Sequence, residues 1–319
     1  MKKTIFILGA LSILLGMVWV RYKPEEKQKT VIKIGVVQDS THSAIEEARQ
    51  GFIDELSSDL GIGVEFVVMN SEGDPAVLKE IVHAFHEDES IRAMYAIATP
   101  AAKAAIEAEA YKPIFVSAIT NPEVLREQPS RDNVCGASDE VQMSSLVEMM
   151  NTLLPDIKKV AVLNTEGDEA SIYSLQDLKK ILTIWGIECD VLSIQTRADL
   201  PKTLGKIFIE GAEAIILPTD NVLAKSMPYI ASEARQKGVP VFTTNTSGIE
   251  DGVLASCGVN YYEQGKRSAQ LARQVLLAKV SPNKFKIQKS EEIEFYINKA
   301  VLNQLGLIAP EGLEKVKLL

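Results

Sequence analysis

Length, composition and charge already limit what this chain can be. At 319 residues and 35.0 kDa it exceeds the size at which a single hydrophobic core stops growing, and a hydrophobic content of 46% is ample for two buried sheets. The formal net charge is −9 and no block of Lys and Arg follows one helix face, so the chain would repel a phosphate backbone and nucleic acid is not expected as a partner.

Residues 1–30 are expected to be a signal or membrane-anchor segment with a tether, outside the folded part. Lys2 and Lys3 precede an almost unbroken apolar run over residues 5–20, which as a helix would measure about 24 Å at ~1.5 Å per residue. That is short of a hydrocarbon core of ~30 Å, although local thinning could accommodate it. The pattern predicts a periplasmic or other extracytoplasmic location, and the segment could contact the membrane.

The end of the apolar run leaves cleavage open. Residues 14–17 look like the bacterial lipoprotein box with Met17 where the lipid-bearing Cys would be, so thioether lipidation there is chemically impossible. No convincing small-x-small cleavage site precedes Arg21. A cleaved signal and an uncleaved anchor to the inner membrane are both compatible with the sequence, with residues 22–30 as a solvated tether.

From Val31 onward, strands and helices alternate, which predicts an α/β fold with parallel sheets and right-handed crossovers. Expected strands cover residues 31–38, 64–70, 93–98, 114–118 and 134–137. The helix after the first strand places Ile45, Ala48, Phe52 and Leu56 on one face, and further helices are expected at 75–85 and 101–108.

The pattern then restarts, which implies a second, similar lobe. Helices are expected at 141–154, 171–184, 200–208 and 223–237, and strands at 160–163, 188–193, 214–217 and 241–243. An apolar run at 253–258, a helix at 262–277, a polar stretch at 281–289, a strand at 293–297 and a short helix follow. We place crossings between lobes near Ser138, Gly258 and Ser290, so one lobe comprises residues 31–138 with 259–289 and the other 139–258 with 290–319.

Three apolar strands run into short polar loops, at residues 99–100, 218–221 and 244–247. In an open α/β sheet such loops lie at the carboxyl ends of the strands, where small ligands bind. Thr99 is expected to cap the helix that begins there, with Pro100 in its first turn, and the exposed N–H groups could receive a ligand carboxylate. Ordinary helix capping explains the same residues.

Asp220 is the acidic residue of these loops, and it is either the partner of a ligand ammonium or the cap of the helix that follows. His42, in the loop after the first strand, either contacts ligand or is a capping or exposed residue. Tyr261 and Tyr262 either pack at the hinge or stack on a ligand. Neutral hydrogen bonds to a ligand are expected from the polar residues of the remaining loops: Gln38, Thr120, Asn121, Asn221, Asn245, Thr246 and Ser247.

Neither a metal site nor a cofactor is expected. His83 and His86 lie three apart on a charged helix face, which favours solvated surface, and Cys135, Cys189 and Cys257 fit small buried hydrophobes. The chain lacks a Gly-rich nucleotide fingerprint and a nucleophile elbow, so it is not expected to be an enzyme.

Several segments together resemble one family, the ABC-transporter substrate-binding proteins of the type I periplasmic binding fold, whose members include tryptophan-binding and tyrosine-binding proteins. The resemblance spans residues 32–310 in unchanged order. It implies two Rossmann-like lobes joined by a multi-strand hinge, which close on a small solute. It also implies a monomer that delivers the solute to an ABC permease with its ATPase. The segments that carry it are 34–38 with His42, Ala44 and 48–52, then 98–102, 118–122, 217–221, 244–252 and 258–265.

The chain departs from the family pattern at ligand-facing positions. Asn121, Asn245 and Asn260 stand where members usually carry Asp, Gly248 replaces a Ser, and Ala170 replaces an Asn of the cleft. An amide lacks the negative charge that pairs with an ammonium, so an aromatic amino acid does not follow from the resemblance alone. A membrane-tethered sensor that signals through a partner protein is the alternative function, and the absent lipoprotein Cys favours it.

Overall fold

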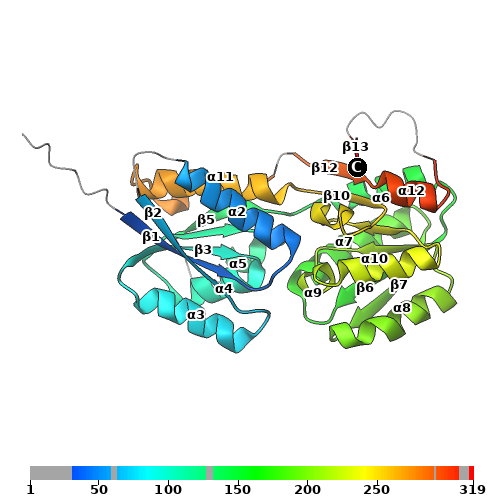
Figure 1. The fold of residues 1–319 in the computed structure, drawn as a ribbon, viewed down its shortest axis with the longest axis horizontal. Helices are drawn as coiled ribbons and strands as arrows, with labels where there is room; N and C mark the ends of the chain where they lie inside the picture. Colours follow the sequence, from blue (N-terminus) through cyan, green and yellow to red (C-terminus); the bar gives the residue numbers. More distant parts are fainter. Residues whose placement is uncertain (1–30, 59–62, 127–131, 291, 309–315) are drawn as a thin grey trace, which may run out of the picture.

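The computed structural model describes residues 31–58, 63–126, 132–290, 292–308 and 316–319. The expected signal or anchor segment at 1–30 lies outside these ranges. Among the described residues, no helix is both long and apolar enough to cross a membrane. The chain forms two sheets side by side, each covered by helices on both faces (Figure 1), which confirms the predicted α/β class.

The first sheet is parallel throughout, with the order β11-β5-β4-β3-β1-β2. Because helices cover both faces, its central strands are continuous apolar runs; every residue of β3 except Arg92 is buried. Its strands are β1 (Val31–Gln38), β2 (Gly63–Asn70), β3 (Ile91–Ile97), β4 (Ile114–Ser117), β5 (Val134–Ser138) and β11 (Ile287–Lys289).

Two helices cover each face of this sheet. The buried sides of α2 (Ser43–Ser57) and α11 (Tyr261–Leu276) pack on one face, and those of α3 (Pro75–Glu87) and α4 (Thr99–Ala108) pack on the other. The predicted apolar stripe of α2 is confirmed, since Ile45, Ala48, Phe52 and Leu56 are all buried. A short helix, α5 (Glu123–Arg126), which the sequence analysis did not predict, follows β4.

The second sheet has the order β13-β12-β10-β9-β8-β6-β7. All neighbours are parallel except β10 and β12, which are antiparallel, so the expectation of a wholly parallel sheet was wrong there. Its strands are β6 (Lys159–Thr165), β7 (Glu188–Ile194), β8 (Ala214–Leu217), β9 (Val241–Thr243), β10 (Ala255–Gly258), β12 (Glu294–Ile297) and β13 (Val316–Leu318).

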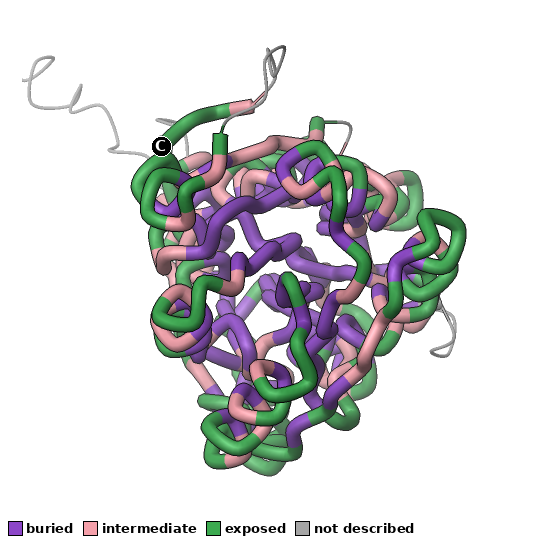
Figure 2. The backbone as a smooth tube through the Cα atoms, turned by 90° about the vertical axis from the view of Figure 1, so that its right-hand side faces the viewer, coloured by how far each residue is buried: buried purple, intermediate pink, exposed green. Residues whose placement is uncertain are grey.

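Helices again cover both faces of this sheet. The sides of α6 (Met143–Leu153), α7 (Glu169–Ile184) and α12 (Lys299–Gln304) belong to one buried cluster, and those of α8 (Leu200–Ile209) and α10 (Met227–Gln236) to another. Short 3-10 helices lie at Arg197–Asp199 (η1), Thr246–Ile249 (η2) and Pro282–Lys284 (η3). The strands run through the buried interior and exposed backbone lies mainly at the periphery (Figure 2).

The helix expected over residues 223–237 is instead two helices, α9 (Asn221–Ala224) and α10. Pro228 is the physical reason. In the interior of one long helix it would remove a backbone hydrogen bond and clash with the preceding turn, whereas it fits the first turn of a new helix. The polar stretch at 281–289 also differs from expectation, because it contains η3 and the edge strand β11.

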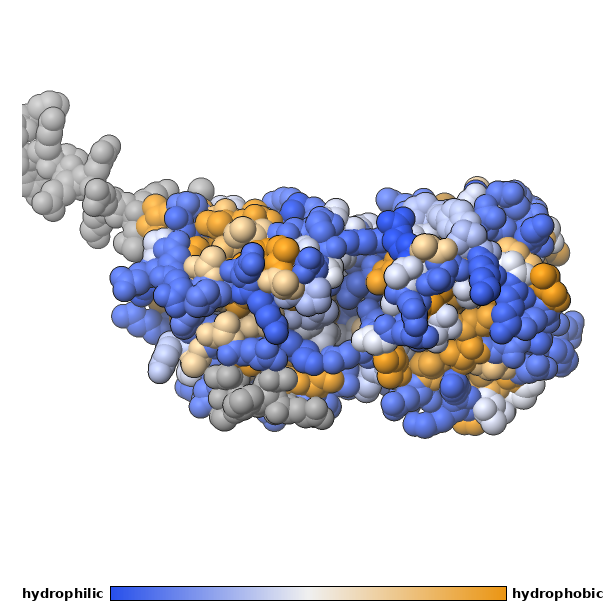
Figure 3. Space-filling model, turned by 90° about the horizontal axis from the view of Figure 1, so that it is seen from below, coloured by the Kyte–Doolittle hydropathy of each residue, from blue (hydrophilic) through white to orange (hydrophobic). Residues whose placement is uncertain are grey.

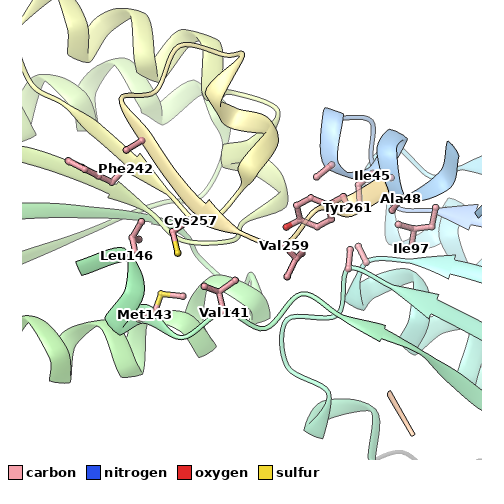
Figure 4. Close-up of a cluster of buried hydrophobic side chains, with 14 of the residues drawn as sticks. Ile45, Ala48, Ile97, Val141, Met143, Leu146, Phe242, Cys257, Val259 and Tyr261 are labelled. Carbon is pink, nitrogen blue, oxygen red and sulfur yellow. The ribbon is translucent and has the colours of Figure 1, made fainter. Parts of the chain in front are cut away.

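The chain passes from one sheet to the other after β5, after β10 and after β11. One hydrophobic cluster continues through this hinge, where Val141, Val259 and Tyr261 are all buried. Figure 4 shows these three between Phe242 and Leu146 of one lobe and the α2 side chains of the other. We call the first sheet with its helices the first lobe, and the second sheet with its helices the second lobe. The proposed boundaries stay as predicted: the first lobe comprises residues 31–138 with 259–289, and the second comprises 139–258 with 290–319.

Candidate functional site

A cleft lies where the loops after the strands of the two sheets meet. The side chains leave only about 20 Å³ of internal space between them, so the cleft is narrow in this structure. Much of the surface where the lobes meet is hydrophilic (Figure 3). The lining residues come from both lobes and the hinge: His42, Ala44, Ile45, Thr99, Ala118, Thr120, Asp139, Ala170, Pro218, Thr219, Asp220, Asn221, Ala224, Met227, Asn245 and Tyr261.

The structure brings part of the predicted site together at this cleft. The predicted residues that line it are His42, Thr99, Thr120, Asp220, Asn221 and Asn245, whereas Gln38, Asn121, Thr246 and Ser247 do not. Gln38 is buried and donates from Nε2 to Glu46 Oε1 at 2.9 Å. Asn121 accepts from the Glu123 N–H at 3.1 Å, at the start of α5.

Thr246 and Ser247 also have partners of their own. The Thr246 hydroxyl donates to the Val259 carbonyl at 2.7 Å, which ties η2 to the hinge. The Ser247 hydroxyl donates to Glu47 Oε1 at 2.8 Å, which joins η2 to α2 of the first lobe. Burial raises the pKa of Glu47, and the bond from Ser247 partly opposes this effect. Both predicted residues therefore support the cleft from behind its wall.

Two loops of the first lobe enter the cleft with left-handed backbone. Ala98 and Ala118 have φ values of 77° and 57°, which are uncommon for residues other than Gly and costly to maintain. Ala98 is also the N-cap of α4, so the prediction that Thr99 caps this helix was wrong. Because Thr99 lies inside the first turn, its hydroxyl takes no part in capping and the residue lines the cleft.

His42 and Asn221 meet across the cleft. His42 precedes α2 of the first lobe, and its Nε2 lies 3.3 Å from Asn221 Oδ1 at the start of α9 in the second lobe. Burial lowers the pKa of His42 to about 4, although the hydrogen bond to Asn221 acts in the opposite direction. The imidazole is therefore neutral near pH 7, with Nε2 as the donor in this pair, and its Nδ1 has no partner among the described residues.

Asp220 holds its own loop together. Its Oδ1 accepts from the Val222 and Leu223 N–H groups at 3.0 and 2.9 Å, which caps α9, and from the Thr165 hydroxyl at 2.9 Å. Its Oδ2 accepts from the Thr165 N–H at 2.7 Å. The sequence allowed Asp220 either to bind a ligand ammonium or to cap a helix, and the structure shows the cap. N–H groups and a hydroxyl of the protein already donate to both of its oxygens.

Asp168, which the sequence analysis missed, lies beside Asp220. Burial and the neighbouring Asp220 charge raise the pKa of Asp168 to about 7. The side chain begins α7 by accepting from the Ser171 N–H at 2.9 Å and also approaches the Asn221 N–H at 3.4 Å. The signal was present in the sequence, because a strand, a polar loop and a helix follow one another here as in the predicted loops.

Asp139 and Tyr261 form the back wall of the cleft at the hinge. Asp139 follows β5 directly, and Tyr261 is the first residue of α11. The Tyr261 hydroxyl donates to Asp139 Oδ2 at 3.0 Å. Both side chains are buried, and burial raises the pKa of Asp139 to about 6. Tyr261 thus packs at the hinge, and it also faces the cleft.

Ion pairs at the rim of the cleft also join the lobes. Lys225 Nζ lies 3.2 Å from Glu72 Oε2, and Lys103 Nζ lies 2.7 Å from Glu169 Oε1. Each pair joins a residue of one lobe to a residue of the other. Together with the contacts of His42 and Ser247, these pairs show that the lobes adopt a closed arrangement.

In the described part of the chain, no group of three or more His, Cys, Asp and Glu side chains is placed to hold a metal ion. Cys135 and Cys257 are buried, Cys189 is half-buried, and all three are free. His86 Nδ1 lies 2.9 Å from Glu109 Oε2, so this helix face pairs with a carboxylate of the same lobe.

Comparisons with known proteins give a consistent result. The family profile described as ABC transporter substrate binding protein matches residues 33–317. The chain is 29% identical over 293 residues to a tyrosine-binding protein of Clostridioides difficile (strain R20291), covering 88% of this chain and 82% of the relative. A conserved domain protein from Vibrio cholerae is similar in structure, with a TM-score of 0.83, 29% identity and coverage of 90% of this chain and 99% of that one.

A Streptococcus pneumoniae ABC domain in complex with L-Trp is also similar in fold, with a TM-score of 0.82, 24% identity and coverage of 91% of this chain and 99% of that one. The family profile extends over nearly all of the folded chain, and the two lobes with their intervening cleft have the expected arrangement. The resemblance seen in the sequence is confirmed: the chain belongs to the ABC transporter substrate binding protein family.

Proposed function

We propose that this chain is the extracytoplasmic solute-binding protein of an ABC importer and that it captures a small, amino-acid-like ligand, with aromatic amino acids as the first candidates. Family membership supports the transport role, and the tyrosine-binding and L-Trp-bound relatives support the ligand class. The partner is an ABC permease with its ATPase, which recognises the closed form. The ligand leaves chemically unchanged.

One observation carries this proposal: both lobes and the hinge contribute side chains to one cleft, and direct contacts bridge the lobes around it. A ligand between two hinged lobes stabilises the closed form by as much as it binds that form better than the open one. Binding therefore produces a shape that a permease can recognise.

The chemistry of the cleft suits an amino acid with an apolar side chain. Ala44, Ala118, Ala170 and Ala224 place short apolar side chains on the cleft wall, and Met227 offers an adaptable apolar surface. We propose direct polar contacts to the ligand from His42, Thr99, Thr120, Asn221 and Asn245. Asp220 is proposed to shape its loop, and the remaining predicted residues support the cleft one layer further back: Gln38, Asn121, Thr246 and Ser247.

The N-terminal pattern extends the proposal to location. We propose that residues 1–30 direct export and either are removed or remain as an anchor to the inner membrane, while the folded part acts as a monomer outside the cytoplasm. Mass spectrometry of the protein purified from membranes would distinguish the two forms, because cleavage removes the apolar run at residues 5–20.

Thermal-shift screening of the twenty amino acids and related metabolites, after native mass spectrometry of protein purified from cells, tests the function. We expect one class of amino acid to raise the unfolding temperature. Ala170→Trp fills the cleft and should abolish the shift, whereas Ile209→Trp, at a site 88% exposed on the second lobe, should preserve it. A shift that survives Ala170→Trp would place the ligand elsewhere.

A further inference from the structure

One buried carboxylate in the cleft has unused hydrogen-bonding capacity. Asp139 is only 2% exposed and lines the cleft. Its Oδ2 receives the Tyr261 hydroxyl, but its Oδ1 has no hydrogen-bond partner within the described ranges. The Thr120 hydroxyl also faces this carboxyl group and lowers its pKa, yet it does not lie in hydrogen-bonding geometry with Oδ1. An ionised carboxylate can accept about four hydrogen bonds.

The other carboxylates near the cleft already have partners. Asp220 accepts hydrogen bonds on both oxygens from N–H groups and a hydroxyl of its own lobe. Glu47 receives the Ser247 hydroxyl, and Asp168 receives backbone N–H groups at the starts of α7 and α9. A ligand cation at any of these would have to compete with existing donors, whereas Asp139 offers a free acceptor.

We infer that Asp139 binds the protonated amine of the ligand through Oδ1 and thereby selects amine-bearing ligands over amine-free acids. This assignment deepens the proposed function and rests on it. A buried, unpaired carboxylate is costly to keep ionised, so a ligand that supplies the missing positive charge gains the interaction that the free protein lacks.

The groups around Asp139 do not oppose a ligand cation. Glu140 follows Asp139 in the chain but is paired with Lys289, whose Nζ lies 2.6 Å from Glu140 Oε2. The Tyr261 hydroxyl keeps its proton because burial and the Asp139 charge raise its pKa. His42, which lines the cleft at the start of α2, is neutral because its pKa is lowered to about 4, so it does not repel an ammonium. Asp139 is therefore buried at the hinge beside groups that are neutral or already paired.

A pair of ligands and a pair of variants test the assignment by titration calorimetry. L-Tryptophan and indole-3-propionate differ in the α-amino group, so the ratio of their affinities measures what that amine contributes. We expect Asp139→Asn to weaken L-tryptophan by about 10- to 100-fold and indole-3-propionate by less than about threefold. Glu140→Gln removes the same charge one residue away, outside the cleft lining, and should leave the ratio unchanged.

The wild-type protein alone gives a second readout that does not depend on how a variant folds. Near pH 6 the Asp139 carboxyl is partly protonated, and an incoming ammonium should displace about half a proton per ligand. Calorimetry in buffers of different ionisation enthalpy should detect this release for L-tryptophan and not for indole-3-propionate. Asp139→Asn should abolish the difference between the two ligands.

The outcomes separate this inference from the proposed function. If Asp139→Asn weakens both ligands equally, or neither, Asp139 does not bind the amine although the protein still captures solutes. A wild-type protein that binds indole-3-propionate as tightly as L-tryptophan also overturns the assignment. If no amino acid binds at all, the proposed ligand class itself fails, and the inference fails with it.

Discussion

The carboxylate of Asp220 accepts two hydrogen bonds from a single residue, Thr165: one from its backbone N–H at 2.7 Å and one from its hydroxyl at 2.9 Å. Thr165 ends β6 and Asp220 follows β8, the neighbouring strand of the second sheet. The same carboxylate caps α9. One side chain thus fixes the loops of two adjacent strands where they enter the cleft.

Asp220→Ala should therefore weaken the fold as well as the site. The substitution leaves buried N–H groups of Thr165 and Leu223 without an acceptor, so we expect a loss of about 2 to 4 kcal/mol in the free energy of unfolding, measured with urea. Asn245→Ala removes the cap of the short helix η2 and should cost about 1 kcal/mol. Equal losses in the two variants would contradict the role assigned to Asp220.

Much of the fold could be predicted because its signals are local. Alternating apolar runs and amphipathic stretches indicated most strands and helices in their order. The direction of β12 could not be predicted, because it depends on how the chain arrives from the other lobe. The strand β11 was also missed, since Ile287, Gln288 and Lys289 form a short polar edge without an apolar run.

The site was predictable only in part, because residue type does not reveal which partners a side chain will find. The loop positions of His42, Thr99 and Asn245 were enough to place them near the cleft. Asp139 looks like an ordinary turn residue in the sequence, and its partner Tyr261 lies 122 residues further along the chain. Asp139 and Tyr261 meet only because the hinge brings the end of β5 next to the start of α11.

The contact between α2 and α11 depends on glycine. A Cβ atom at Gly265 would lie 2.0 Å from the Ala48 carbonyl oxygen, and one at Gly51 would lie 2.0 Å from the Tyr262 carbonyl oxygen. Gly265→Ala should force the helices apart and lower the free energy of unfolding by about 1 to 3 kcal/mol. Gly205→Ala in α8, where nothing lies within 4 Å, is the control and should stabilise the protein by about 0.5 to 1 kcal/mol. A neutral Gly265→Ala would show that the helices do not approach this closely.

The rim ion pairs should favour the closed form in a salt-dependent manner. Lys225 and Lys103 each reach a carboxylate of the opposite lobe, and partly exposed pairs of this kind weaken as ionic strength rises. We expect a variant with Lys103→Met and Lys225→Met to show a larger radius of gyration at low salt in X-ray scattering. Lys180→Met, which removes a pair within α7, is the control. Identical scattering from all three proteins would mean that the rim pairs do not hold the lobes together.

Asp139 should make the ligand-free protein less stable as the pH rises. Its pKa is raised from 3.8 to about 6, mainly by burial, so the folded state holds the proton more tightly than the unfolded state does. Below about pH 4 the carboxyl is protonated in both states and imposes no penalty, and the penalty grows until the pH passes about 6. Asp139→Asn should therefore match the wild type near pH 4 and exceed it near pH 8, by on the order of 2 to 3 kcal/mol in the free energy of unfolding.

Asp168, with a pKa raised to about 7, shifts stability in the same direction but is present in both proteins, so its effect cancels in the difference. A variant that loses stability equally at both pH values would show that Asp139 is a fully satisfied structural group, because only an uncompensated buried charge gives an advantage that appears as the pH rises.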